Sequence, residues 1–233
     1  MEIEGARVLV AGATGVLGGH ISRALNGEGA HLVLGGRNSE VLETIGSELG
    51  APTATFDAED TENCCALVAR AAEELGGLDA LVIAFGVVAF GEEADTGDAV
   101  TADLFQVNTL APIAMLRTAA AEVADGGTVA AVTAVTAEYP TAGMATYSAG
   151  KAALSAWMQA VRSEYRHRRI SVLDVRAPHM DTGIADRAIA GTPPHNLPEP
   201  YPVDEVIDAL LQALRSDAKQ VAFDPRDRQL GVR

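Results

Sequence analysis

The sequence is poor in basic residues and poorest in lysine. Its 233 residues hold 17 lysines and arginines against 32 aspartates and glutamates, which gives a formal net charge of −15. Binding to nucleic acid irrespective of base sequence needs a basic surface, so this composition argues against a nucleic-acid partner. Lys151 and Lys219 are the only lysines. A lysine inside a motif therefore carries more weight here than in an ordinary chain.

Long apolar runs and a disulfide framework are also missing. No apolar run reaches the ~20 residues that cross a bilayer. Residues 1–8 lack the basic and apolar parts of a signal peptide. The only cysteines, Cys64 and Cys65, are adjacent in a helical pattern and point in different directions, so a disulfide framework is not expected. We therefore expect a cytoplasmic protein with free thiols, no membrane partner and no metal site.

The chain shows a regular alternation of apolar runs and helical patterns. Strands are expected over residues 7–11, 31–34, 53–56, 80–84, 128–132, 170–175 and 220–223. Helices are expected over residues 15–26, 39–49, 61–75, 100–123, 147–167 and 203–214. Helices between successive strands imply crossovers, and so a parallel sheet with helices on both faces. We predict one α/β domain over residues 1–233, with a doubly wound, Rossmann-like parallel sheet of about seven strands.

One stretch interrupts this regularity. Residues 183–202 are rich in proline and glycine. A loop of this length inside a compact domain is usually a lid or a binding loop, so we predict that it borders the substrate. The alternative is a disordered surface connection. Residues 224–228, after the last expected strand, have the composition of a polar tail.

A glycine-rich turn follows the first expected strand and opens the first helix. It has the sequence Gly12-Ala13-Thr14-Gly15-Val16-Leu17-Gly18. Glycines let the backbone amides approach a pyrophosphate, and the helix N-terminus adds a partial positive charge. The turn predicts nucleotide binding; the alternative is a turn used only for packing. The candidate cofactor residues are Gly12, Thr14, Gly15, Val16 and Leu17.

The end of the second expected strand bears on which nucleotide binds. An NAD-selective site places an acidic residue there to bond the ribose hydroxyls, but the chain has Gly35-Gly36-Arg37-Asn38. Arg37 can instead pair with a 2′-phosphate, so NADP(H) is favoured over NAD(H). Asp57, after the third strand and followed by Ala58, is a candidate for the adenine amino group; the alternative is a role at the start of the next helix.

The strongest chemical signal is Tyr147-Ser148-Ala149-Gly150-Lys151. Residues four apart share one face of a helix, so the phenol and the ammonium lie together. A free tyrosine titrates near ~10, and a nearby cation favours the phenolate. The pair thus predicts a general acid or base. The alternative is an exposed tyrosine beside a chance lysine.

Three more motifs stand in order with these: Ala84-Phe85-Gly86 after the fourth strand, Asn108 in the long helix, and Pro178 with Thr182 after the sixth strand. By this series of motifs the chain resembles the single-domain branch of the short-chain dehydrogenase/reductase family from about residue 7 to residue 223. The resemblance implies that Asn108 keeps a water that relays protons from Lys151. It also implies that Thr182 bonds the nicotinamide carboxamide. The positions that it adds to the cofactor site are Ala84, Phe85, Gly86, Tyr147, Lys151, Pro178 and Thr182.

The chain departs from the family at the catalytic serine, which usually stands thirteen residues before the tyrosine. Ala134 occupies that position. A shifted loop could present Thr133, which we carry as a candidate catalytic residue, or Thr136. Either threonine could equally serve packing or a turn. His179, in place of the glycine that usually follows Pro178, is a third candidate for the missing donor.

The resemblance implies an NADP(H)-dependent oxidoreductase that interconverts a carbonyl and an alcohol, with Tyr147 as general acid or base. The segments expected around the substrate, residues 85–90, 136–144 and 180–202, carry few charges, which favours a small to medium, fairly apolar substrate. The alternative is a dinucleotide-binding protein with weak or no redox activity, such as a sensor or a partner subunit. The resemblance also implies a homodimer or homotetramer.

Overall fold

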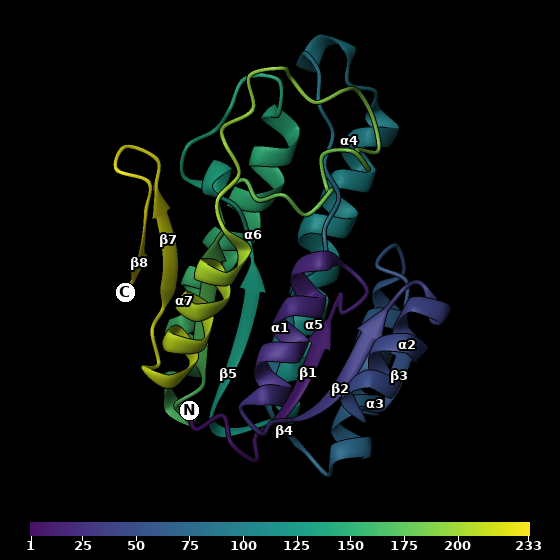
Figure 1. Ribbon diagram of the computed structural model, residues 1–233, viewed down its shortest axis with the longest axis vertical. Coiled ribbons are helices and arrows are strands. Elements are labelled where there is room, and N and C mark those ends of the chain that lie inside the picture. The colour runs from purple at the N-terminus through teal and green to yellow at the C-terminus, as the bar shows by residue number, and fades with distance from the viewer.

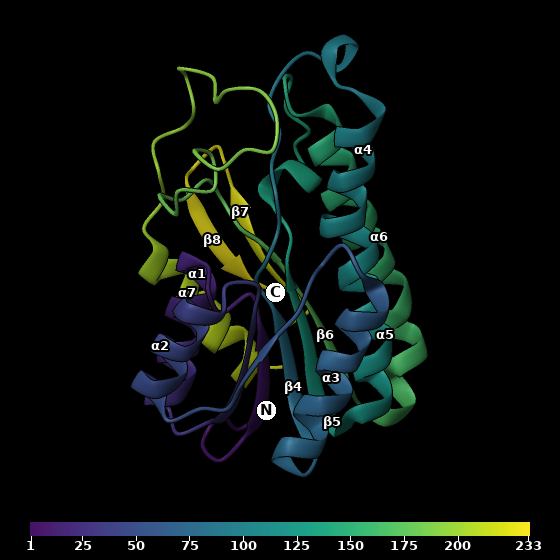
Figure 2. The same ribbon diagram turned by 90° about the vertical axis from the view of Figure 1, so that its right-hand side faces the viewer.

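The computed structural model describes residues 1–233 and consists of one sheet between two layers of helices (Figures 1 and 2). The strands are β1 (Arg7–Ala11), β2 (His31–Gly36), β3 (Thr53–Thr55), β4 (Leu78–Ile83), β5 (Val123–Val132), β6 (Ser171–Arg176), β7 (Gln220–Asp224) and β8 (Gln229–Val232). The helices are α1 (Val16–Gly27), α2 (Ser39–Leu49), α3 (Thr61–Leu75), α4 (Asp98–Phe105), α5 (Ala111–Glu122), α6 (Ala145–Tyr165) and α7 (Val203–Arg215). The predicted single α/β domain with a doubly wound parallel sheet is confirmed.

The strand order is β3-β2-β1-β4-β5-β6-β7-β8. Strand β1 pairs in parallel with both β2 and β4, so the winding of the chain reverses at β1. Val10 lies opposite Leu34 on one side and Val82 on the other. In such sheets the crevice at the carboxyl ends, where the order reverses, is the usual place for a ligand. The glycine-rich turn after β1 lies at that edge.

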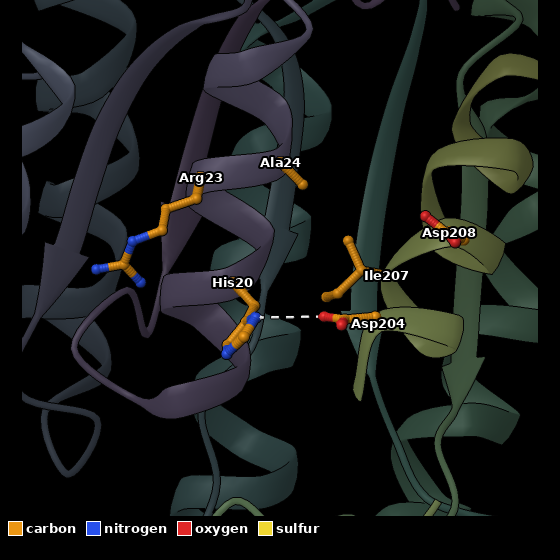
Figure 3. Close-up of a pocket in the computed structure, with 6 residues that line it drawn as sticks. All are labelled: His20, Arg23, Ala24, Asp204, Ile207 and Asp208. Carbon is orange, nitrogen blue, oxygen red and sulfur yellow. Dashed lines mark ion pairs between the residues drawn. The ribbon is translucent and has the colours of Figure 1, made fainter. Parts of the chain in front are cut away.

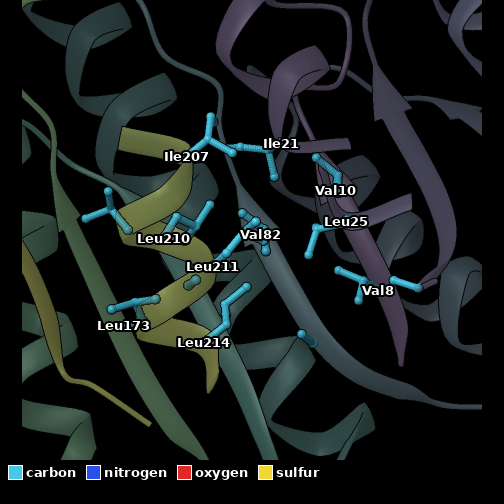
Figure 4. Close-up of a cluster of buried hydrophobic side chains, with 14 of the residues drawn as sticks. Val8, Val10, Ile21, Leu25, Val82, Leu173, Ile207, Leu210, Leu211 and Leu214 are labelled. Carbon is cyan, nitrogen blue, oxygen red and sulfur yellow. The ribbon is translucent and has the colours of Figure 1, made fainter. Parts of the chain in front are cut away.

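The two faces of the sheet carry separate cores. On one face Val10 and Leu173 pack with α1 and α7 (Figure 4). On the other face Val129 and Val172 pack with α3, α5 and α6. Successive side chains of a strand point to opposite faces, so Asp174 shares the α6 face with Val172. This alternation puts a buried carboxylate on the side of the sheet that α6 covers.

The apolar stripe of α6 belongs to the second core. Leu154, Met158 and Val161 are buried in it, and Trp157 packs against its margin. This stripe is therefore explained by packing inside the domain. The helix is held by its buried face, with its first turn at the carboxyl edge of the sheet.

The chain ends in an eighth strand that the sequence pattern did not reveal. Strand β8 pairs antiparallel with β7. The supposed polar tail is the turn between them: Asp224 accepts a hydrogen bond from the Arg226 amide at 2.8 Å, and Asp227 accepts one from the Gln229 amide at 3.2 Å. Acidic side chains that bond the backbone two residues on are typical of turns. The strand has only four residues, none of them buried, so it gives little periodic signal.

The helix expected over residues 100–123 is interrupted. Between α4 and α5 the chain makes a π-helical turn, η2 (Gln106–Leu110), which includes Asn108. Such turns insert one extra residue and often occur at functional sites. Residues 98–122 are long and apolar enough to cross a membrane, but half of their most apolar stretch is buried inside the protein. Buried core helices often have the same length and apolar composition.

Candidate active site

The turn between β1 and α1 is built by close backbone approach. Gly12 has a φ of +100°, and a Cβ on it would lie 2.8 Å from the carbonyl carbon of Ala84. A Cβ on Gly18 would lie 2.1 Å from the oxygen of Gly12. No side chain caps α1, whose first amides are therefore free to bind an anion. Val16, at the start of α1, is 43% exposed. A pyrophosphate fits this cradle.

The end of β2 adds a positive charge beside the cradle. A Cβ on Gly36 would lie 2.4 Å from Cγ2 of Thr14, so the strand end runs close against the glycine-rich turn. Arg37 follows at once, is exposed, and makes no ion pair with any acidic residue of the chain. An unpaired guanidinium at this edge suits a 2′-phosphate.

Asp57 and Ala58 follow β3, Asp57 exposed and Ala58 half-buried. The carboxylate of Asp57 accepts a hydrogen bond from the Glu59 amide at 3.0 Å, whereas Asp60 caps α3. The carbonyl of Ala58 accepts a bond from the Gln106 side chain at 3.1 Å, which ties this turn to the π-helical turn. Asp57 thus shapes its own turn and keeps a second carboxylate oxygen for a ligand.

Gly86, Asn108 and Lys151 come together after β4. A Cβ on Gly86 would lie 2.7 Å from Oδ1 of Asn108 and 3.2 Å from Nζ of Lys151. Asn108 is fully buried, donates to the carbonyl of Val87 at 2.8 Å and accepts from its amide at 3.2 Å. The side chain of Asn108 therefore fastens η2 to the segment after β4, a contact that the sequence did not predict.

Tyr147 and Lys151 lie on the first turns of α6. Lys151 is buried, its Nζ is 6.0 Å from the centre of the half-buried Tyr147 ring, and it donates to the carbonyl of Val132 at 3.1 Å. Burial lowers the pKa of Lys151 to about 8, which the charge of Asp174 partly opposes. Burial also raises the pKa of Tyr147 to about 12. The shift of the tyrosine pKa is thus opposite to the lowering expected from the lysine, and the phenol stays protonated near neutral pH.

Thr133, which the sequence offered as a candidate catalytic residue, uses its hydroxyl to bond another part of the protein. Thr133 is buried, and its hydroxyl donates to Oδ1 of Asp174 at 2.5 Å. By contrast, Thr136 is 9% exposed and its buried hydroxyl has no hydrogen-bond partner. Thr136 lies in the short helical turn η3 (Val135–Ala137), which packs against α6. Ala134, before this turn, is buried and extended.

The segment after β6 brings Pro178, His179 and Thr182 over the same edge of the sheet. Pro178 and Thr182 are buried. Burial lowers the pKa of the His179 imidazole, which the charge of Asp181 partly opposes. The backbone of His179 accepts a bond from the amide of Tyr201 at 2.8 Å, which closes the base of the loop over residues 183–202.

That loop is docked on the segment after β4. The amide of Ile189 donates to Val88 at 2.8 Å, and the amide of Phe90 donates to Ala190 at 3.0 Å, as in a short parallel ladder. A Cβ on Gly191 would lie 1.7 Å from the oxygen of Phe90, so only glycine fits there. Figure 1 shows the loop in yellow-green above the carboxyl ends of the strands.

Sequence reasoning missed a buried ionic group beneath α6. Asp174 is 1% exposed and accepts hydrogen bonds from Thr133, from Ser155 at 2.6 Å and from Arg176 at 3.0 Å. Arg176 also donates to Glu138 at 2.6 Å. The available signal was an aspartate inside the apolar strand pattern, where a carboxylate needs partners to be buried.

A groove of about 370 Å³ lies away from these residues, between α1 and α7. Figure 3 shows that His20 points across it to Asp204, with Nδ1 3.7 Å from Oδ1. None of the residues that line the groove belongs to the predicted site. No group of three or more histidine, cysteine or acidic side chains is arranged to hold a metal ion.

Comparison with known proteins agrees with the geometry. The family described as short chain dehydrogenase matches residues 6–192. Nodulation protein G of Rhizobium meliloti is 30% identical over 190 residues, which cover 80% of this chain and 78% of that protein.

Two solved structures have the same fold over most of their length. A dehydrogenase/reductase from Sinorhizobium meliloti superposes with a TM-score of 0.80 and 25% identity, covering 91% of this chain and 90% of its own. A short chain dehydrogenase from Burkholderia cenocepacia in complex with NADP gives 0.79 and 25%, covering 92% of each chain. On these matches and on the site that the fold assembles, the chain belongs to the short-chain dehydrogenase/reductase family of oxidoreductases.

Proposed function

We propose that the protein is an NADP(H)-dependent oxidoreductase that interconverts a carbonyl and an alcohol. The observation that carries the proposal is the meeting of Tyr147, Lys151 and Gly86 at the carboxyl edge of the sheet, beside the anion cradle after β1. The phenol and the ammonium lie on α6, and the segment after β4 connects them to the cradle, because Ala84 lies against Gly12 and Gly86 lies against Lys151. This is the arrangement that proton transfer next to a bound dinucleotide requires.

The cofactor is held by parts of the chain that fit its chemistry. The free amides at the start of α1 take the pyrophosphate, and Arg37 takes the 2′-phosphate. Asp57 faces the adenine end. Pro178 and Thr182 border the nicotinamide end, and Ala84 and Phe85 lie against the glycine-rich turn. When bound, the nicotinamide supplies a hydride to the carbonyl carbon or accepts one from the alcohol.

Tyr147 supplies the proton in this account. Burial raises the pKa of its phenol to about 12, so the group is protonated at neutral pH, as an ordinary tyrosine also is, and can donate to a carbonyl oxygen. Lys151 holds the nicotinamide ribose, and Asn108 fixes the turn through which a water could link Lys151 to solvent.

The second donor to the substrate oxygen is Thr136 in our proposal. Its buried hydroxyl has no partner, and such a group gains a hydrogen bond when a ligand oxygen reaches it. The hydroxyl of Thr133 is bound to Asp174, so that candidate moves from the catalytic set to the supporting network. His179, the third candidate for the missing donor, is half-buried, and burial lowers the pKa of its imidazole.

The substrate is proposed to be small to medium and fairly apolar. Val88, Phe90 and Met180 are buried where the segments after β4 and β6 face the loop over residues 183–202. We also keep the family expectation of a homodimer or homotetramer, and the composition-based expectation of a cytoplasmic protein.

A dinucleotide-binding protein without redox turnover is the second candidate, and Ala134 favours it. Where the family has a hydroxyl, this chain has a methyl group. One lost donor of this kind costs about a hundredfold or more in rate. A site in which Thr136 does not replace it would bind the cofactor and turn over slowly.

The two candidates are separated by binding followed by turnover. Trp157 is the only tryptophan, so its fluorescence reports NADPH and NADH titrations directly. Consumption of NADPH is then measured against a panel of apolar aldehydes and ketones. We expect tighter binding of NADPH than of NADH, and turnover of at least one class of carbonyl. Tight binding of NADPH with no consumption by any carbonyl would leave only the second candidate.

A further inference from the structure

The buried group around Asp174 lies between β6 and α6, one helical turn from Lys151 of the proposed redox site. We infer that Asp174 is a positioning residue that keeps Lys151 charged and holds the segment of residues 133–138 against α6. The inference rests on the proposed function for the use that is made of Lys151. The contacts that carry it come from four separate parts of the chain.

The carboxylate reaches the lysine helix through Ser155. Ser155 stands four residues after Lys151, so the two side chains share one face of α6. Its hydroxyl donates to Oδ2 of Asp174 at 2.6 Å, and both residues are buried. Asp174 therefore lies one helical turn from the lysine, on the face of the sheet that α6 covers.

The same carboxylate reaches β5 through Thr133. Thr133 donates to Oδ1 of Asp174, and the preceding residue, Val132, receives the bond from Nζ of Lys151. The ammonium and the carboxylate are thus bound to two adjacent residues, the last residue of β5 and the one after it, without a direct ion pair. Lys151 and Asp174 are both buried, and a buried charge is stabilised by a nearby opposite charge more strongly than an exposed one.

Arg176 links this centre to the proposed substrate segment. It donates to Asp174 at 3.0 Å, to Ser155 at 3.0 Å and to Glu138 at 2.6 Å. Glu138 immediately follows η3, the turn that carries Thr136. The network therefore fixes both the lysine and the turn that carries Thr136, the proposed second donor to the substrate oxygen.

The charges around the lysine have opposing effects. Asp174 raises the pKa of Lys151, against the larger effect of burial. Arg162 and Arg176 also face the carboxylate, and Glu138 pairs with Arg176. Tyr147 is the remaining titratable group beside the ammonium. Removing the carboxylate must lower the lysine pKa, whereas removing a neighbouring guanidinium must raise it.

The test measures the lysine itself and needs neither cofactor nor substrate. Because Lys151 and Lys219 are the only lysines, protein grown on isotope-labelled lysine gives two side-chain NMR signals, which a Lys219→Arg variant assigns. We expect Asp174→Asn to lower the pKa of Lys151 by about one unit. We expect Arg176→Gln to shift it in the opposite direction.

A matched control comes from the amino end of the central strands. Asp79, near the start of β4, forms a partly buried pair with Arg7 of β1 at 2.9 Å, and β4 is two strands away from β6, which carries Asp174. Asp79→Asn should leave the titration of Lys151 unchanged. An unchanged or raised pKa in Asp174→Asn, or an equal shift in Asp79→Asn, overturns the inference.

The test remains decisive if one variant does not fold, and its outcome is independent of the proposed function. If Asp174→Asn does not fold, Arg176→Gln decides alone: a raised pKa of Lys151 supports the inference, and an unchanged or lowered one refutes it. The result is also separate from the proposed function. A protein that shows the expected shifts but turns over no carbonyl retains the positioning network and loses the oxidoreductase proposal.

Discussion

The two ends of the crevice are built in different ways. At the nucleotide end, the site is formed mainly by the backbone: Gly12 and Gly18 let chain segments touch, and α1 begins without a side-chain cap. At the reactive end, the site is formed by side chains. Lys151, Asn108 and Asp174 are all buried and come from three different elements. The first end is set by a short local motif, and the second by long-range packing.

This difference explains why the same chain can keep one end and vary the other. A glycine-rich turn has few substitutes, because any side chain would meet backbone atoms. A hydroxyl donor can come from neighbouring positions, and here Ala134 has no hydroxyl whereas Thr136, two residues on, has one without a partner. Substitutions should therefore act on binding at one end and on proton transfer at the other.

The largest effect is expected at the phenol. Tyr147→Phe removes the proposed proton donor and should lower kcat by about a hundredfold to ten-thousandfold. Binding of NADPH should hardly change. Tyr165→Phe, at the far end of the same helix, is the control and should keep full turnover. Steady-state kinetics on a responsive carbonyl measure both; equal rates for Tyr147→Phe and the native protein would remove the phenol from the mechanism.

The next effect concerns the glycine-rich turn. Gly18→Ala places a methyl group 2.1 Å from a backbone oxygen and should lower the free energy of unfolding by about 2 kcal/mol or more. Gly27→Ala, in the same helix but with no atom within 4 Å, should be neutral or stabilise by up to about 1 kcal/mol. Denaturant unfolding compares the two. Equal stability would show that the close approach at Gly18 relaxes without cost.

A smaller change is expected at the end of β2. Arg37→Gln should weaken NADPH binding by about tenfold to thirtyfold, because one charge-assisted contact to the 2′-phosphate is lost. Binding of NADH, which lacks that phosphate, should not change. Arg70→Gln, another exposed arginine, controls for net charge. Fluorescence titration gives the dissociation constants, and a parallel loss for NADH would assign Arg37 another role.

The smallest effect is a gain. Ala134→Ser restores a hydroxyl at the usual family position and should raise kcat by about tenfold. Thr136→Val should lower the rate of the native protein more than that of the Ala134→Ser variant, since the serine then supplies the donor. If Thr136→Val leaves the native rate intact, Thr136 is not the substitute donor.

Much of this architecture could be predicted from the sequence. The alternation of apolar runs and helical patterns located seven of the strands and the parallel sheet, since both follow from local periodicity. The glycine-rich turn could also be predicted, because it is a local run of residues between an expected strand and an expected helix. Strand β8 was missed because it is short and partly exposed, and because it is a strand only through its antiparallel pairing with β7.

The rest depends on contacts between distant residues. The sequence placed Tyr147 and Lys151 on one helical face, but it could not show that burial raises the tyrosine pKa. Nor could it show that Thr133 bonds to Asp174, because the two are joined only when β5 and β6 pair. The π-helical turn at Asn108 was likewise hidden inside a continuous helical pattern.

The central claim is that Tyr147 and Lys151 support redox chemistry without the usual serine. The most direct test follows deuterium from labelled NADPH into the alcohol product, with native protein and with Tyr147→Phe. We expect label in the product for the native protein, and a loss of that label in the variant while NADPH binding persists. Tight binding of NADPH by the native protein, with no labelled alcohol from any carbonyl of the panel, would contradict it.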